Sequence, residues 1–298
     1  MRKADRHETD IGTDQGRREV SVYEPYSRQK IGFVKTWILM VSNIVSSRQL
    51  IYQLFKRDFF ASYKKSFLGI GWIILGPIFG IISWVFMNAT GILNPGDVGI
   101  PYPAYVLLST SIWGLFVGFF TAAQGTLGSG AAFIMQVKYP HEALLLKQMA
   151  QHIANFIIAF LLNIAVLLSF GVIPSWKIIF FPVLILPMFF LAAGIGLVVS
   201  VVAVVAAEIQ TGVNLILGLL IYVTPVIYAP TFKNPILQAI IKWNPLTYLI
   251  GVPRDIVIYG RIDHFERFVI TSLLSLLIFL FSWRLFFVSE DKVIEKMI

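Results

Sequence analysis

The chain has 298 residues, of which 57% are hydrophobic and only 13% are charged, and its mean hydropathy is +0.77. Soluble domains carry about a quarter charged residues, so the composition excludes an ordinary soluble protein. The chain contains no cysteine, which excludes a disulfide framework, thiolate metal sites and cysteine nucleophiles. The net charge of +8 would suit nucleic acid, but the basic residues are placed as at a membrane surface, and we expect no nucleic-acid partner.

The N-terminal part of the chain divides into two regions. Residues 1–32 are polar, lack the apolar core of a signal peptide and are predicted to form a cytosolic tail. Residues 33–66 are predicted to form an amphipathic helix region in the plane of the membrane interface. Within it, helical spacing gives an apolar face, Ile51, Leu54, Phe55 and Phe59, opposite a polar face, Gln53, Lys56, Arg57 and Lys64.

Two details of this region leave its role open. A second stripe, Trp37, Val41, Ile44 and Val45, precedes the first, with Asn43 among the residues facing away. One interpretation is therefore a passive anchor on anionic lipid. Asp58 and Ser62, however, fall inside the apolar face, where a pure anchor would not place them, and this favours a gate or docking helix.

The rest of the chain carries long uncharged apolar runs. A helix needs roughly 20 residues to cross the hydrocarbon of a bilayer. Six runs are predicted as spans within residues 67–287: Phe67–Thr90, Tyr102–Ala123, Gln148–Phe170, Ile178–Ala206, Gly212–Tyr228 and Phe268–Trp283. The fifth run ends around Pro225, which is expected to break it. The fold class is thus an all-α integral membrane protein with six transmembrane helices, followed by a cytosolic C-terminus at 288–298.

Basic residues orient the chain. With the N-terminus inside, eighteen of the 24 Lys and Arg residues lie on the cytoplasmic side and six outside, which is the positive-inside bias. Five of those six lie in residues 229–267 and are discordant with it. That segment holds the apolar stretches Pro235–Trp243 and Pro245–Ile250 and is predicted to form two re-entrant helices, against the alternative of an ordinary external loop.

The predicted spans contain no Lys or Arg, and acidic residues only at their ends. Ion-coupled transporters depend on ionisable groups inside the membrane, and here His152 is the single candidate, in a position where a histidine more often packs than functions. Enzymes that act on lipid-linked sugars through Mg²⁺ need clustered carboxylates. The predicted spans contain no such cluster, which disfavours an enzyme of this kind. The sequence also lacks the GxxxxGK[ST] phosphate loop, so ATP hydrolysis within this chain is not expected.

Four motifs in register resemble the permease subunits of polysaccharide-exporting ABC transporters, the exporters of O-antigen, capsule and teichoic acid. They are listed in chain order: Lys56-Arg57-Asp58 with Ser62 to Gly69, Trp72 and Pro77; Pro103-Ala104-Tyr105; Val137-Lys138-Tyr139-Pro140-His141-Glu142; and Pro225-Val226-Ile227-Tyr228 with Asn244-Pro245-Leu246-Thr247. The resemblance runs from about residue 35 to the end. Ala207-Glu208 stands where the family often has Arg-Asp.

The resemblance implies the partners. Two copies of the chain would pair, two copies of a cytosolic ATPase would bind ATP and Mg²⁺, and an undecaprenyl-diphosphate-linked polysaccharide would cross the inner membrane. The chain itself would be a permease rather than an enzyme, without cofactor or metal. The alternatives are a permease of the same fold that exports a drug or a lipid, and a membrane-embedded enzyme of lipid-linked glycan synthesis.

Three candidate sites follow. Lys56, Arg57, Lys64 and Lys65 would hold the carrier phosphate at the cytoplasmic entrance, unless they only snorkel to the interface. Residues Phe133, Ile134, Val137, Lys138, Tyr139, Pro140, His141 and Glu142 would dock the ATPase, unless the apolar half of this stretch packs on its own bundle. Pro225, Tyr228, Trp243, Asn244, Pro245 and Leu246 would form an outer gate, since Pro225 and Pro245 break helices.

Overall fold

The computed structural model describes residues 31–64, 67–69, 71–127, 141–231 and 234–297, with the side chains of 141 and 290–297 excepted. Within these residues the chain is helical and contains no strand. The elements in chain order are α1 Phe33–Ser46, α2 Arg48–Lys64, α3 Gly71–Ala89, α4 Tyr102–Gln124, α6 His141–Ser169, the 3-10 helix η2 Trp176–Phe180, α7 Phe181–Leu184, α8 Leu186–Ala203, α9 Ala207–Val223, α10 Pro235–Trp243, α11 Pro245–Ile258 and α12 Phe265–Met297.

The bundle is built around α4, most of whose residues are buried. Helix α8 packs against both α4 and α12, and two glycines bring the backbones together. A Cβ atom on Gly196 would lie 2.6 Å from the carbonyl oxygen of Phe120, and one on Gly194 would lie 3.1 Å from the Cα atom of Phe279. Small residues at helix contacts are how membrane helices approach closely.

Five helical stretches are long and apolar enough to cross a membrane: Gly71–Ala89, Tyr102–Gln124, Glu142–Ser169, Trp176–Ala203 and Phe265–Ser289. They coincide with five of the six predicted spans. The predicted fifth span, Gly212–Tyr228, is instead the shorter helix α9, which has 17 residues and begins and ends earlier. It ends at Val223 because Pro225 disfavours a helical conformation of the residue before it, and Thr224 is extended, with φ −109° and ψ 133°.

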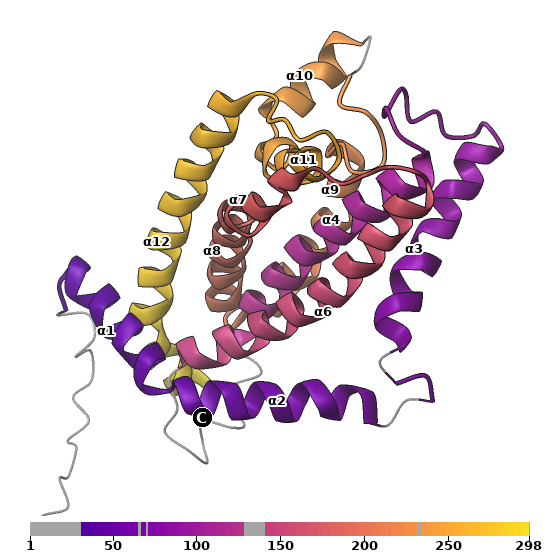
Figure 1. Cartoon of the computed structure of the whole chain (residues 1–298). Helices are drawn as coiled ribbons and strands as arrows, with labels where there is room; N and C mark the ends of the chain where they lie inside the picture. Colours follow the sequence, from indigo (N-terminus) through magenta and orange to yellow (C-terminus); the bar gives the residue numbers. More distant parts are fainter. Residues whose placement is uncertain (1–30, 65–66, 70, 128–140, 232–233, 298) are drawn as a thin grey trace, which may run out of the picture.

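The short helices lie at the two ends of the bundle (Figure 1). Helix α2 runs across one end, and the C-terminal end of α12 reaches the same end. Helices α10 and α11 lie at the opposite end, within the predicted segment 229–267. The side chain of Asn234 caps α10 and that of Asn244 caps α11, each with proline in the first turn, which is a favoured helix start.

Helix α1 packs on the bundle through two residues that lie outside the apolar stripe predicted to face the membrane interface. Its buried residues are Thr36 and Met40, whereas Val41 and Val45 are 49% and 56% exposed. The predicted stripe follows hydropathy alone. The buried face is the one turned toward α6 and α12, which α1 contacts, and an apolar residue need not turn inward in a membrane protein.

Candidate functional site

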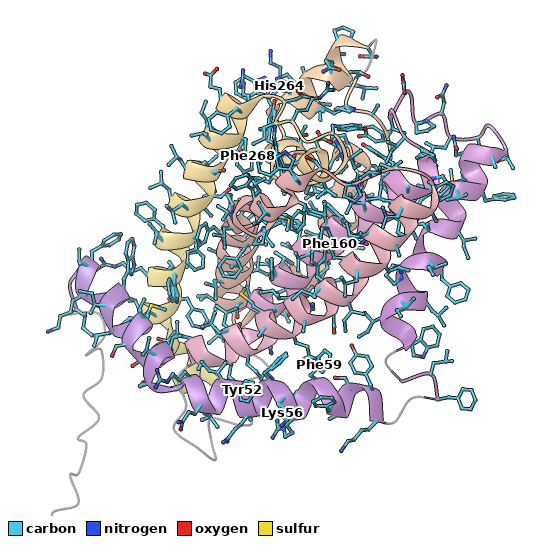
Figure 2. All side chains as sticks on the ribbon, in the orientation of Figure 1. Tyr52, Lys56, Phe59, Phe160, His264 and Phe268 are labelled. Carbon is cyan, nitrogen blue, oxygen red and sulfur yellow. The ribbon has the colours of Figure 1, made fainter. Side chains whose placement is uncertain are left out.

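The end of the bundle that is predicted to face the cytoplasm is organised by α2 lying on α6. Leu54 is buried against Ala143 and Leu144, and Ile51 packs beside it. Lys56 is exposed, and Figure 2 shows Lys56 and Phe59 along α2. The buried residue Leu54 and the partly buried Ile51, Phe55 and Phe59 are those of the predicted apolar face.

Polar contacts between α2 and α6 explain why Asp58 and Ser62 interrupt that apolar face. The Nζ atom of Lys147 lies 2.7 Å from Oδ2 of Asp58, and Nε2 of Gln151 donates to Oγ of Ser62 at 3.1 Å. One turn further along α6, Oδ1 of Asn155 accepts a hydrogen bond from the Tyr63 hydroxyl at 3.0 Å. Since residues four apart share one side of a helix, Lys147, Gln151 and Asn155 form one polar row facing α2.

Asp58 of α2, which faces this row, forms ion pairs with two basic residues. Its Oδ1 also accepts from Nε of Arg57 at 2.7 Å. Partial burial acts to raise the pKa of Asp58, but hydrogen bonds and the positive charges of Arg57 and Lys147 outweigh it and lower the pKa below 3.8. The carboxylate is therefore charged at neutral pH and holds two cations.

The basic residues predicted at the phosphate entrance are only partly brought together. Lys56, Arg57 and Lys64 are exposed on α2, and Lys65 lies outside the described residues. By helical geometry, Arg57 and Lys64 share one side, two turns apart, and Lys56 lies about a quarter turn away. Arg57 is also engaged with Asp58.

Most of the predicted ATPase-docking stretch, Phe133 to Pro140, lies outside the described residues. His141 begins α6. Glu142 is 2% exposed, and Nδ2 of Asn43 in α1 lies 3.5 Å from its Oε1. In the single chain Glu142 is therefore turned toward α1.

At the opposite end, residues 224–229 follow an irregular path after α9, and carbonyl groups on this path and at the end of α9 accept hydrogen bonds from side chains. The Tyr102 hydroxyl donates to the carbonyl of Ile227 at 3.0 Å, and the Tyr105 hydroxyl donates to that of Tyr228 at 3.0 Å. Nδ2 of Asn244 donates to the carbonyl of Val223 at 3.0 Å. These bonds satisfy backbone groups released where α9 ends, as a non-polar surrounding requires.

Arg254 of α11 holds this path, and the sequence analysis did not single it out. Its side chain is 3% exposed, and its Nη1 donates to the Tyr105 hydroxyl at 2.6 Å and to the carbonyl of Pro225 at 2.9 Å. Its Nε pairs with Asp255 at 2.7 Å, and its guanidinium lies 4.7 Å from the centre of the Tyr105 ring. The available signal was an arginine inside an otherwise apolar helical stretch.

Some of the predicted gate residues are buried in the bundle and others are exposed. Pro225, Tyr228 and Leu246 are buried, and Asn244 joins the end of α9 to the start of α11. Pro245 occupies the first turn of α11. Trp243 is 77% exposed, with the Arg267 guanidinium 5.8 Å from its ring centre.

Comparison with known proteins relates the chain to a family of membrane transporters. The profile of the ABC-2 type transporter family matches residues 49–258. The chain is 22% identical over 246 residues to the O-antigen export system permease protein RfbA of Myxococcus xanthus, covering 81% of this chain and 92% of that protein. Two permease proteins of the same name from Klebsiella pneumoniae are 22% and 23% identical, covering 76% and 72% of this chain and 87% and 82% of those proteins.

The family match includes α2 except its first residue, the polar row on α6, and the whole of the Pro225–Asn244–Arg254 region. It spans well over half of the chain. Helices long enough to cross a membrane, found independently in the structure, are what a transporter of this kind requires. The chain is therefore a multi-pass membrane protein that belongs to the ABC-2 type transporter family.

Proposed function

We propose that the chain is the permease subunit of an ABC transporter that exports lipid-linked polysaccharide of the O-antigen type across the inner membrane. The observation that carries the substrate class is the similarity to three O-antigen export permeases, which extends over 82–92% of their length. Energy would come from ATP hydrolysis in a separate cytosolic subunit.

The proposed topology has six crossings, with both termini in the cytosol. Helix α2 and the C-terminal end of α12 lie at the same end of the bundle (Figure 1), so an even number of crossings must separate them. Five long stretches are present, and α9 supplies the sixth. Its 17 residues would span about 26 Å, close to the roughly 30 Å of hydrocarbon.

We place the second copy of the chain against α3 and α9. Among the described residues, α3 buries only Ile73 and Ile81, and α9 buries only Leu217. The two helices meet through Trp84 and Tyr222, whose ring centres are 6.0 Å apart. A shared, lightly buried face of this kind suits a conduit between two copies.

Transport by purified components tests the function. The permease and its cognate ATPase would be reconstituted in vesicles with undecaprenyl-diphosphate-linked O-antigen, and ATP-dependent appearance of the glycan on the far side would be measured. Transport of lipid or drug without glycan would instead support the alternative substrates.

Reporter fusions test the proposed topology. Fusions after Asn94 and Asn234 should report an extracytoplasmic position, and one after Gln136 a cytoplasmic position.

The ATPase contact is proposed at residues 133–141, without Glu142, which is 2% exposed and contacts Asn43 of α1. Val137→Asp should reduce co-purification with the ATPase while leaving insertion and pairing intact. Val41→Asp, on the exposed side of α1, is the matching substitution that tests the N-terminal helices as the alternative docking surface. Loss of the ATPase with Val41→Asp and not with Val137→Asp would move the docking surface to the N-terminal helices.

A further inference from the structure

A cavity of about 540 Å³ lies where the end of α2 meets α3, α4 and α6. This volume falls in the range of about 300–1,000 Å³ typical of small-molecule sites. Its lining comes from these four helices, with a single contribution from α9. The cavity is adjacent to the contact between α2 and α6 described above.

The lining is aromatic and polar but carries no formal charge. Trp72 and Trp84 of α3 contribute indole rings, and Tyr63 of α2 contributes a phenol. Among the described lining residues there is no Lys, Arg, Asp or Glu. A diphosphate would find no cation here, so the lining favours an uncharged ligand with an apolar face and several hydroxyl groups.

Polar groups in the cavity remain available to such a ligand. Asn155 accepts from Tyr63 through Oδ1, while its Nδ2 donates to no described residue. His152 lines the cavity beside it, and its ring nitrogens bond to no described residue. The hydroxyls of Thr110 and Ser111 donate to backbone carbonyls at 2.6 and 2.8 Å, which leaves their oxygen atoms free to accept.

We propose that this cavity binds one neutral sugar ring of the exported glycan, and that binding opens the hydrogen bond between Tyr63 and Asn155. The inference rests on the proposed function for its substrate class. The ring would stack on Trp72, and its hydroxyls would bond to Asn155 and His152. The carrier phosphate would stay outside, near Lys64 on the exposed side of α2, one residue from Tyr63.

The consequence is a link between substrate and α2. Tyr63 is the last residue before Lys64, where α2 ends. Of the bonds between α2 and the polar row of α6, its bond to Asn155 lies nearest this end of α2. A sugar hydroxyl that takes Oδ1 of Asn155 releases the end of α2 next to the first span. The Asp58–Lys147 contact would keep the rest of α2 docked.

Equilibrium binding tests the site. The permease in lipid nanodiscs would be titrated with the lipid-free oligosaccharide repeat of the host polysaccharide. Trp72→Ala and Asn155→Ala should each weaken binding about tenfold, which corresponds to about 1.4 kcal/mol. The matched control Trp176→Ala removes an indole that is 74% exposed in η2 and should leave affinity unchanged.

The outcomes separate the site from the function. Equal affinity in all variants, while the unmodified protein with its ATPase still transports glycan, would contradict the site and leave the function standing. Competition by undecaprenyl phosphate alone would assign the cavity to a lipid chain and overturn the proposed site. Absence of any glycan transport by the unmodified protein with its ATPase would instead overturn the proposed function.

A second measurement addresses the opening of the Tyr63–Asn155 bond. Tyr63→Phe keeps the ring and removes the bond that the ligand must break, so sugar affinity should rise about fivefold. Spin labels on cysteines at Phe60 and Ile157, both exposed, should move apart when the oligosaccharide is added. An unchanged distance together with unchanged affinity in Tyr63→Phe would show that Tyr63 is only a wall of the cavity.

Discussion

Lys147 and Asp58 are 89 residues apart in sequence, yet the ammonium nitrogen of one lies 2.7 Å from a carboxylate oxygen of the other. Their side chains are 14% and 25% exposed. The contact joins helix α2 to the long helix α6, which also lines the cavity. The ion pair therefore fixes the position of α2 relative to α6.

Asp58→Asn should loosen α2 from α6. The substitution keeps the size of the side chain but leaves the largely buried Lys147 without its anion, at a cost of about 1–3 kcal/mol. Hydrogen exchange of the α2 amides should accelerate accordingly. The control is Asp263→Asn, because the pair of Asp263 with Arg261 is 50% and 69% exposed and such pairs contribute about 0–1 kcal/mol. Equal protection of α2 in Asp58→Asn and the unmodified chain would contradict this role.

The docking of α2 should depend on pH only in acid. The pKa of Asp58 is lowered in the folded chain from 3.8. Its stabilisation is therefore fully present above about pH 4 and is lost as the pH falls through the lowered pKa. Exchange protection of α2, corrected for intrinsic rates, should stay constant between about pH 5 and pH 8 and fall only below that range. Asp58→Asn should lack the acid step, and a change near neutral pH would point to another group.

Gly196→Ala should destabilise the bundle. The added Cβ atom would lie 2.6 Å from the carbonyl oxygen of Phe120 and 2.7 Å from the Cβ atom of Ala123, so the backbones of α8 and α4 must separate. Overpacking of this kind costs about 1–3 kcal/mol. The melting temperature in detergent should fall. Gly32→Ala, just before α1, is the control, since nothing lies within 4 Å of its added Cβ, and an equal effect of both substitutions would exclude the packing explanation.

The sequence was sufficient for features that depend on composition along a single helix. Hydropathy located five spans, and helical spacing found the buried face of α2 around Leu54. It did not identify Thr36 and Met40 as the residues of α1 that pack on the bundle, because that choice depends on the neighbouring helices. Asp58 was noticed as an exception within an apolar face, but its partner Lys147 is defined only by the packing of α2 on α6.

The end of the bundle that holds α10 and α11 shows the same limit more clearly. Arg254 is one of the five basic residues in 229–267 that disagree with the positive-inside bias, because that segment is predicted to lie on the external side. The structure gives the reason: it is buried and bonded to Tyr105 and to the carbonyl of Pro225, so it is not a loop charge of the kind the rule concerns. Its position followed from neither periodicity nor spacing, since its partners come from α4 and from the end of α9.

Neutralising the exposed basic residues of α2 should weaken binding of the carrier phosphate. Lys56→Gln with Lys64→Gln is preferred to a change at Arg57, because Arg57 also bonds to Asp58 and its loss would disturb α2. Each lysine near a phosphate surface contributes about 1 kcal/mol, so the affinity for undecaprenyl diphosphate should fall by about 2 kcal/mol. Lys242→Gln with Arg261→Gln, exposed at the opposite end, is the control. Unchanged affinity and export would favour snorkelling.

Replacing Arg254 should open the outer segment. Arg254→Met removes the donors that hold the carbonyl of Pro225 and the Tyr105 hydroxyl, and it leaves Asp255 without its 2.7 Å partner. Breaking a buried ion pair costs about 3–5 kcal/mol. A cysteine at Leu246, which is 4% exposed, should then react faster with a water-soluble maleimide. In the unmodified background that cysteine should become reactive only during ATP turnover with the ATPase, if the segment is a gate.

Two controls separate a specific effect of Arg254 from a general rise in cysteine reactivity. A cysteine at Ile240, already 43% exposed, should react at nearly the same rate whether or not Arg254 has been replaced. Arg261→Met, which removes an exposed cation nearby, should leave the Leu246 cysteine protected. If that cysteine stays protected in Arg254→Met, the buried arginine does not hold the segment. If it reacts equally at rest and during turnover in the unmodified background, the segment is a static plug, because a gate must expose its buried side chains when the conduit opens.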